Sequence, residues 1–408
     1  MSDRTDETSI RLPESWRSKS TALLAVGAIG LLIGGAMFLW GTDQALASRY
    51  LVHSYLTNFI YCLSFGLGAI FFVMIHHLCR AGWSSSIRRV AELIASTIPW
   101  TAILFVPILL MVLSGSSMLY EWNQPKAELH GLTAEKTGYL NASFFALRSA
   151  IYIGLLIWMT RWYFRRSTTQ DESGSVDLTL QMQKWSGPMI MIYALLVSFL
   201  AFDWIMSIDA DWYSTIFGVY LFAGSMFGFF ALMICLLMAL QDSGVLTRQV
   251  NTEHFHDMGK FLFGFTMFWS YIAFSQLLLY WYGNIPEETN WYRERLSGGW
   301  AALGYLLIPV HFVLPWLGLV SRHVRRHRFG LTFWAVWALV AHWLDMTYLI
   351  LPNSGPVSTV VIIAHLLVGL GMFAILISFW LRQASQVSLL AVRDPRLEES
   401  LAYTNPLL

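Results

Sequence analysis

The chain has 408 residues, of which 56% are hydrophobic and only 12% charged, about half the charged share of soluble proteins. A soluble fold of this size could not cover its surface with so few charges. The 26 Lys and Arg against 25 Asp and Glu give a net charge of +1, so no basic field exists to attract nucleic acid. The three cysteines, Cys62, Cys79 and Cys235, lie in or beside apolar runs, which excludes a disulfide-rich scaffold. The composition predicts an all-α integral membrane protein.

Stretches without Asp, Glu, Lys or Arg mark six spans, since a helix needs roughly 20 apolar residues to cross the hydrocarbon core. Three further spans each carry one buried charge, Arg148, Asp203 or Asp345. The run 346–381 is broken by a proline-rich turn signal at 352–356, and a tenth helix follows it. In chain order, the ten predicted helices are 20–42, 50–79, 93–120, 139–161, 187–207, 212–241, 261–286, 296–321, 329–350 and 357–381.

Positive charges are unequally divided between the two sides of these helices. The side of the two termini carries 19 Lys and Arg and the opposite side carries 5, so the positive-inside rule predicts cytoplasmic termini. The predicted organisation is a cytoplasmic tail at 1–19, a membrane domain at 20–382 and a cytoplasmic tail at 383–408. His254 and His256, just before the seventh helix, are expected to lie in solvent.

The second and sixth helices resemble each other. At an offset of 158 residues, seven of the eighteen positions 55–72 are identical. An offset of four helices preserves direction, so the pattern predicts a parallel repeat of two four-helix bundles. Bundle one would contain helices 2–5 (about 50–207) and bundle two helices 6–9 (about 212–350), with helices 1 and 10 flanking them.

Candidate functional groups are ionisable side chains at membrane depth, because each of them is costly in hydrocarbon. The sequence has no haem-attachment motif, iron–sulfur cysteine run, Walker A loop or dinucleotide fingerprint. We therefore expect no covalently bound cofactor, no metal and no catalytic residue. The depths of Arg148 and Asp203 allow an ion pair between antiparallel neighbouring helices, with a purely structural pair as the alternative.

A second set of ionisable groups lies in bundle two and in the flanking helix ten. His311 and His342 are mid-span, Asp345 follows His342 by one helical turn, and His365 lies in the outer half of helix ten. Imidazoles beside a carboxylate can pass protons. Alternatives are histidines that bind backbone carbonyls, or a bis-histidine haem b. The proton-path candidates are Arg148, Asp203, His311, His342, Asp345 and His365.

Glycine and proline punctuate several of the helices. Glycines 27, 30, 34 and 35 in helix one, and Gly224 and Gly228 in helix six, are predicted to form small-residue faces for close helix contact. Prolines at 99 and 107 in helix three, and at 309 and 315 in helix eight, are predicted to kink their helices.

Two aromatic-polar motifs carry a family resemblance. The first motif is Phe202-Asp203-Trp204-Ile205-Met206-Ser207, and it continues with Asp211-Trp212-Tyr213-Ser214-Thr215-Ile216-Phe217-Gly218-Val219-Tyr220. The second motif is Phe268-Trp269-Ser270-Tyr271-Ile272-Ala273-Phe274-Ser275-Gln276, and it is followed by Trp281-Tyr282-Gly283-Asn284-Ile285-Pro286-Glu287-Glu288-Thr289. From helix two to helix ten the chain resembles the ActF family, the second large membrane subunit of bacterial alternative complex III, within the NrfD/polysulfide-reductase membrane-subunit superfamily.

The resemblance implies a bacterial cytoplasmic-membrane subunit of a quinol:cytochrome c or quinol:oxidase complex. Implied partners are a paralogous quinol-site membrane subunit, an iron–sulfur subunit, c-type haem subunits and lipid, with menaquinone or ubiquinone in the complex and no nucleic acid. The buried charges then predict a proton-conducting subunit without a redox cofactor. A quinone-binding subunit with unknown site residues, a structural scaffold and an independent transporter are the alternatives.

Overall fold

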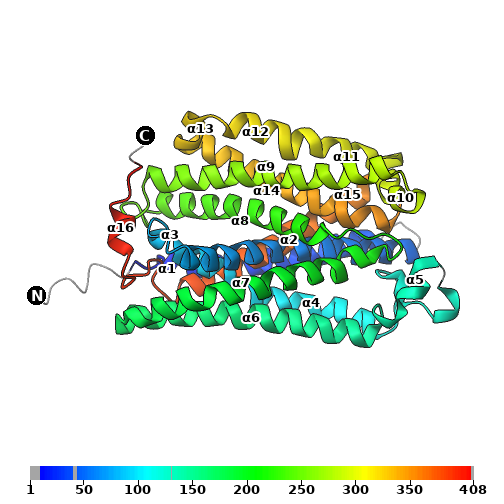
Figure 1. Ribbon diagram of the computed structural model, residues 1–408, viewed down its shortest axis with the longest axis horizontal. Coiled ribbons are helices and arrows are strands. Elements are labelled where there is room, and N and C mark those ends of the chain that lie inside the picture. Colours follow the sequence, from blue (N-terminus) through cyan, green and yellow to red (C-terminus); the bar gives the residue numbers. More distant parts are fainter. Residues whose placement is uncertain (1–9, 40–43, 130, 406–408) are drawn as a thin grey trace, which may run out of the picture.

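A computed structural model of the protein describes residues 10–39, 44–129 and 131–405, and every regular element in these residues is a helix (Figure 1). Ten segments of this part of the chain are long and apolar enough to cross a membrane, which confirms the predicted number. They are α1 (Glu14–Leu39), α2 (Gln44–Leu78), α3 with α4 (Ser85–Ala95 and Ile98–Leu113), α6 (Ala142–Ser173), α7 (Val176–Trp204), α8 (Phe217–Asp242), α9 (Thr252–Gly283), α11 with α12 (Ala301–Leu307 and Leu314–Leu319), α14 (Arg328–Ile350) and α15 (Thr359–Ala384).

Shorter helices lie in the connections between the spans and after the last one. They are α5 (Gly131–Glu135), α10 (Pro286–Arg295), α13 (Arg322–Arg326) and α16 (Leu397–Leu401), together with single 3₁₀ turns at Glu121–Asn123, Lys126–Glu128, Lys136–Gly138, Met206–Ile208, Gly298–Trp300 and Leu351–Ser354.

Two of the spans are broken near prolines. The third span is divided between α3 and α4 at residues 96 and 97, just before Pro99. The eighth span contains a π-helical turn, Ile308–Val313, which begins beside Pro309 and holds His311. A proline ring removes one backbone donor and collides with the preceding turn, which disfavours a regular helix at these positions. Breaks are thus present beside Pro99 and Pro309, whereas Pro107 lies inside the continuous helix α4 and Pro315 lies in the first turn of α12.

Helices α2 and α8 form the centre of the molecule. They pack on each other, and nearly all of their length is buried. Figure 1 shows this central pair between α4, α6 and α7 on one side and α9, α12 and α14 on the other. Apart from Arg49 near the start of α2 and Asp242 at the end of α8, both helices lack charged residues. A helix with so few charged residues is suited to such an enclosed position.

Helices α1 and α15 pack through their glycines. A Cβ atom added at Gly27 would lie 2.7 Å from the carbonyl oxygen of Gly371, and one added at Gly34 would lie 2.9 Å from that of Ala364. Only glycine allows the two backbones to approach so closely, as the small-residue face in helix one predicted.

The described residues before α1 and after α15 lie against the same end of the helix bundle, which we call the tail end. The backbone N–H of Leu389 donates to the carbonyl oxygen of Ile10 (2.8 Å). Asp394 forms an ion pair with Arg88 of α3, and Ser400 accepts a hydrogen bond from the N–H of Ser86 (3.1 Å). Much of the predicted C-terminal tail is therefore packed onto the bundle.

This packing overturns the expectation that His254 and His256 lie in solvent. Both side chains are buried at the start of α9. The Nε2 atom of His254 is 3.1 Å from the hydroxyl of Ser400, and its ring centroid is 5.5 Å from that of Tyr403. The sequence-based expectation was wrong because the segment after α15 covers residues that would otherwise face water.

Candidate functional site

Arg148 and Asp203 form a bidentate ion pair between α6 and α7. Nε of Arg148 is 2.7 Å from Oδ2 of Asp203 and Nη2 is 3.0 Å from Oδ1. Tyr152 donates a further hydrogen bond to Oδ2 (2.6 Å), and Nη1 of Arg148 donates to the carbonyl oxygen of Tyr139 (2.8 Å). The predicted ion pair is therefore present. Both carboxylate oxygens are occupied by short, charge-assisted contacts, as expected of a pair whose function is to hold two helices together.

His311, His342 and Asp345 converge into a second buried cluster, which we call the central cluster. One donor atom from each residue lies within 4.8 Å of the other two, and all three side chains are inaccessible to solvent. His342 and Asp345 lie one turn apart on α14, whereas His311 comes from the π-helical turn of the eighth span. The sequence predicted that these residues lie together, and the described contacts confirm it.

Asp345 has no cationic partner among the described residues. Its Oδ1 accepts a hydrogen bond from the hydroxyl of Tyr220 (2.5 Å), and its Oδ2 accepts one from the indole Nε1 of Trp269 (3.0 Å). These two neutral donors are the only side chains recorded as bound to its carboxyl group in the described part of the chain. Asp345 thus differs from Asp203, whose charge an arginine neutralises directly.

The two imidazoles retain unused hydrogen-bonding capacity. Nε2 of His342 is 2.8 Å from the hydroxyl of Ser64, but its Nδ1 has no partner among the described residues, and neither does either nitrogen of His311. The ring of His311 stacks between Trp269 and Phe227, with centroid distances of 3.6 and 4.4 Å. Buried polar atoms without partners are costly, so the histidines are positioned by packing rather than by satisfied hydrogen bonds.

Two glycines of α8 make room for this arrangement. A Cβ atom added at Gly228 would lie 2.6 Å from Cδ2 of His342. One added at Gly224 would lie 3.2 Å from Cε1 of His342 and 3.7 Å from Oδ2 of Asp345. The predicted small-residue face of helix six therefore accommodates an imidazole, rather than the backbone of another helix.

The donor set also has to be compared with possible cofactors. Two imidazoles and one carboxylate form a set that binds zinc or ferrous iron. Both oxygens of Asp345 already accept hydrogen bonds from Tyr220 and Trp269, however, so the contacts favour a hydrogen-bonded cluster.

His365 belongs to a separate polar group nearer the opposite end of the bundle, which we call the loop end. Its Nδ1 is 2.8 Å from the hydroxyl of Ser54, its Nε2 is 3.0 Å from that of Thr347, and its ring stacks on Trp343 at 4.8 Å. Both imidazole nitrogens therefore have partners. Asn58 completes the group, 3.3 Å from Nδ1 of His365.

A line of polar side chains on α2 extends from this group to the central cluster. Ser54, Asn58, Tyr61 and Ser64 follow one another at helical spacing. The ring of Tyr61 lies 5.5 Å from that of His342, and the hydroxyl of Ser64 contacts the same histidine. We call these four residues the α2 polar line. These residues were not predicted from the sequence because the second span was recognised only by its lack of charged residues. Serine, asparagine and tyrosine are uncharged and so did not stand out within it.

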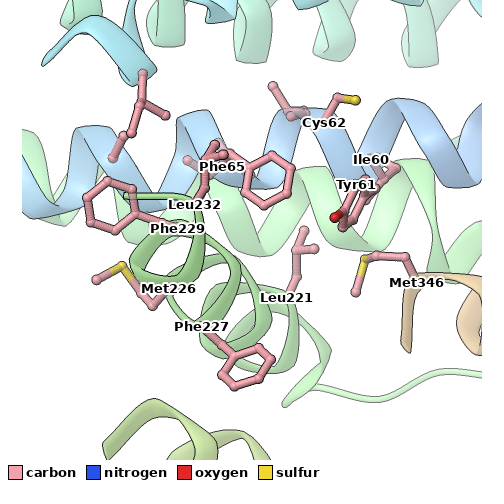
Figure 2. Close-up of a cluster of buried hydrophobic side chains, with 14 of the residues drawn as sticks. Ile60, Tyr61, Cys62, Phe65, Leu221, Met226, Phe227, Phe229, Leu232 and Met346 are labelled. Atoms are coloured by element: carbon pink, nitrogen blue, oxygen red, sulfur yellow. The ribbon is translucent and has the colours of Figure 1, made fainter. Parts of the chain in front are cut away.

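Towards the tail end, the central cluster is bounded by an aromatic layer of Phe65, Phe72, Phe229 and Phe230 (Figure 2 labels Phe65 and Phe229). The Phe72 ring lies 5.3 Å from that of Phe229 and 5.8 Å from that of Phe230. No polar side chain occurs on α2 between Ser64 and His76. Along α2, the polar side chains of the two halves are thus separated by apolar ones. No protein-family model matches the chain, and no curated protein matches it.

Proposed function

We propose that the protein is a multi-pass subunit of a quinol-oxidising electron-transfer complex in a bacterial cytoplasmic membrane, with both termini cytoplasmic. In this proposal the subunit has no redox cofactor and exchanges protons at the central cluster. The observation that supports it most strongly is Asp345, a carboxyl group at membrane depth that has no cationic partner and lies beside two imidazoles with unused nitrogens. Ionisable groups are retained at such depth where they serve transport.

The chemistry requires one proton shared among three groups. With Asp345 protonated, both histidines are neutral and the cluster carries no net charge. Transfer of that proton to His342 or His311 gives a carboxylate and an imidazolium, and the net charge remains zero. Because separated charges are costly in a medium of low dielectric constant, an arrangement that keeps the sum at zero lowers the cost of moving the proton.

The direction of exchange follows from the surroundings of the central cluster. The α2 polar line lies between it and the loop end, whereas the aromatic layer lies between it and the tail end. We infer that protons enter and leave mainly through the loop end, which is the non-cytoplasmic face in the proposed orientation. Passage through the aromatic layer would then require side-chain movement coupled to another step of the complex.

The parallel repeat and the family resemblance belong to this proposal. In support of two bundles, α2 packs on α3, α4 and α7, α8 packs on α9 and α14, and α2 and α8 meet between the two sets. Each proposed bundle also contains one buried aspartate bound by a tyrosine, Asp203 by Tyr152 and Asp345 by Tyr220. The proposed partners are the paralogous quinol-site subunit, the iron–sulfur and c-type haem subunits and lipid, with menaquinol or ubiquinol as the electron donor.

The test is the substitution Asp345→Asn in the assembled complex. Asparagine keeps the volume of the side chain but cannot carry the proton, so assembly should persist while proton release per quinol oxidised falls in proteoliposomes. The control is Ser198→Ala, which removes a hydroxyl of α7 that donates only to the carbonyl oxygen of Ala194 in its own helix, and it should leave proton release unchanged. Undiminished proton release from Asp345→Asn would contradict the proposal.

A structural scaffold is the second candidate, and the Arg148–Asp203 pair favours it. In that pair both carboxylate oxygens of Asp203 already accept hydrogen bonds, and the pair joins α6 to α7. If the subunit is only a scaffold, Asp345→Asn should either leave turnover unchanged or prevent assembly. Quinone that co-purifies with the subunit alone would instead identify a quinone site within it.

A further inference from the structure

A cavity of about 280 Å³ lies between α4, α6 and α15 on the surface of the bundle. It is near the tail end, where α6 approaches its last residues and the third span is broken. The cavity plays no part in the proton exchange proposed above. Its volume is at the small end of ligand pockets and suits a headgroup rather than a whole cofactor.

The charge of this cavity comes from two arginines of α6. Arg161 and Arg165 lie one turn apart on the same helical face and both line the cavity. Neither forms an ion pair with a carboxylate among the described residues. Arg326 and Arg328, which also lie near the tail end, differ because they are neutralised by Glu253 and Asp242, both at 2.5 Å. Two unneutralised guanidinium groups side by side favour an anion between them.

A buried hydroxyl supplies independent evidence of a ligand. Thr160 lines the same cavity and is only 2% exposed, yet its Oγ1 has no hydrogen-bond partner among the described residues. Most threonines in apolar helices satisfy this hydroxyl with a carbonyl of the preceding turn. Gln383 at the end of α15 provides a second polar group at the rim.

The remaining wall of the cavity is apolar and continues onto the exposed face of α4. Ile103 is 57% exposed, and Trp100 lies beside it with its ring stacked on Phe379 at 5.0 Å. Tryptophan is enriched where a membrane-facing surface meets the headgroup region. An anion that binds here would therefore have hydrocarbon immediately next to it.

We propose that this cavity binds one anionic phospholipid of the leaflet at the tail end. The phosphodiester lies between Arg161 and Arg165, and rotation of the Thr160 side chain turns its hydroxyl towards the phosphodiester as a donor. An acyl chain runs along Ile103 and Trp100. Free phosphate would use only the polar half of the site, so a phospholipid satisfies the whole cavity and a small anion does not.

The test measures lipid retention by the full chain purified in detergent. Native mass spectrometry during titration with dioleoyl-phosphatidylglycerol should show one tightly bound lipid, which dioleoyl-phosphatidylcholine does not replace. An arginine near an anionic headgroup contributes about 1 kcal/mol, or about 5-fold in affinity, so Arg161→Gln with Arg165→Gln should weaken binding roughly 30-fold. The matched control is Arg166→Gln on the same helix, because Arg166 contacts Trp162 and Gln181 outside the cavity.

Three results would overturn the proposal. They are equal retention of the two lipids, equal weakening by Arg166→Gln and by the double substitution, and protection of the site by inorganic phosphate as strong as by the lipid. If the double substitution prevents folding, the single substitutions decide, each with an expected loss of about 5-fold. Thr160→Val, which preserves charge and shape, should also weaken the anionic lipid and not phosphatidylcholine.

Discussion

Replacing Arg148 by methionine would leave the Asp203 carboxylate at membrane depth with only the Tyr152 hydroxyl as a partner. Two charge-assisted hydrogen bonds, at 2.7 and 3.0 Å, would be lost. Removal of one member of a buried ion pair typically costs about 3–5 kcal/mol, because the other charge stays buried without compensation. We therefore expect Arg148→Met and Asp203→Leu each to lower the free energy of unfolding by about that amount.

Combining Arg148→Met with Asp203→Leu distinguishes the free energy of the ion pair from that of the packing around it. With both charges removed, the main remaining cost is the unpaired hydroxyl of Tyr152, on the order of 1 kcal/mol. The double variant should then be more stable than either single variant, with a coupling energy of at least about 4 kcal/mol. The assay is equilibrium unfolding in mixed micelles titrated with dodecyl sulfate. Lys184→Met, an exposed charge on α7, is the control and should change stability by less than about 0.5 kcal/mol. A coupling energy below about 1 kcal/mol would refute this account of the pair.

Two further predictions concern the periphery. Gly27→Leu should separate α1 from α15 and make α1 sensitive to protease in detergent. The control is Gly35→Leu, which should leave α1 resistant, because the nearest neighbour of a Cβ atom at Gly35 is a leucine side chain at 3.8 Å. Equal protease sensitivity of the two variants would contradict the packing role of Gly27. Asp209 lies in the connection after the fifth span, and burial raises the pKa of its carboxyl group. Folding therefore disfavours the ionised carboxylate, and this lowers the stability of the folded state by its full amount above the folded-state pKa. Asp209→Asn should therefore raise the thermal unfolding midpoint at pH 8. The increase should vanish below about pH 4, where an ordinary carboxyl group is protonated. An increase in the midpoint that does not depend on pH would show that ionisation of Asp209 is not its cause.

Charge alone made the spans and two of the buried clusters predictable. Ten apolar stretches require ten helices, and the depths of Arg148 and Asp203 left few other partners for either residue. His342 and Asp345 share a face of α14 by spacing, and His311 lies at the same depth. These inferences needed only helical geometry and the cost of charge in hydrocarbon.

The partners of these groups could not be predicted in the same way. Tyr220, Trp269 and Ser64 are ordinary residues of apolar helices, and only the packing of α8, α9 and α2 brings them to the central cluster. The contact of His365 with Thr347 of α14 could not be predicted either, because it depends on how α15 packs against α14. The burial of His254 likewise depends on a segment about 150 residues away in sequence, whose position no local pattern reveals.

The π-helical turn at Ile308–Val313 has a consequence for the whole eighth span. Such a turn contains one residue more than the α-helical turn it replaces, so the segments before and after it are rotated out of phase. His311 points to Trp269 and Phe227 only because of this extra residue. Deleting one residue from the turn would restore an unbroken helix of similar composition and rotate the imidazole away from its two aromatic neighbours. Length, and not only residue type, therefore encodes the position of this histidine.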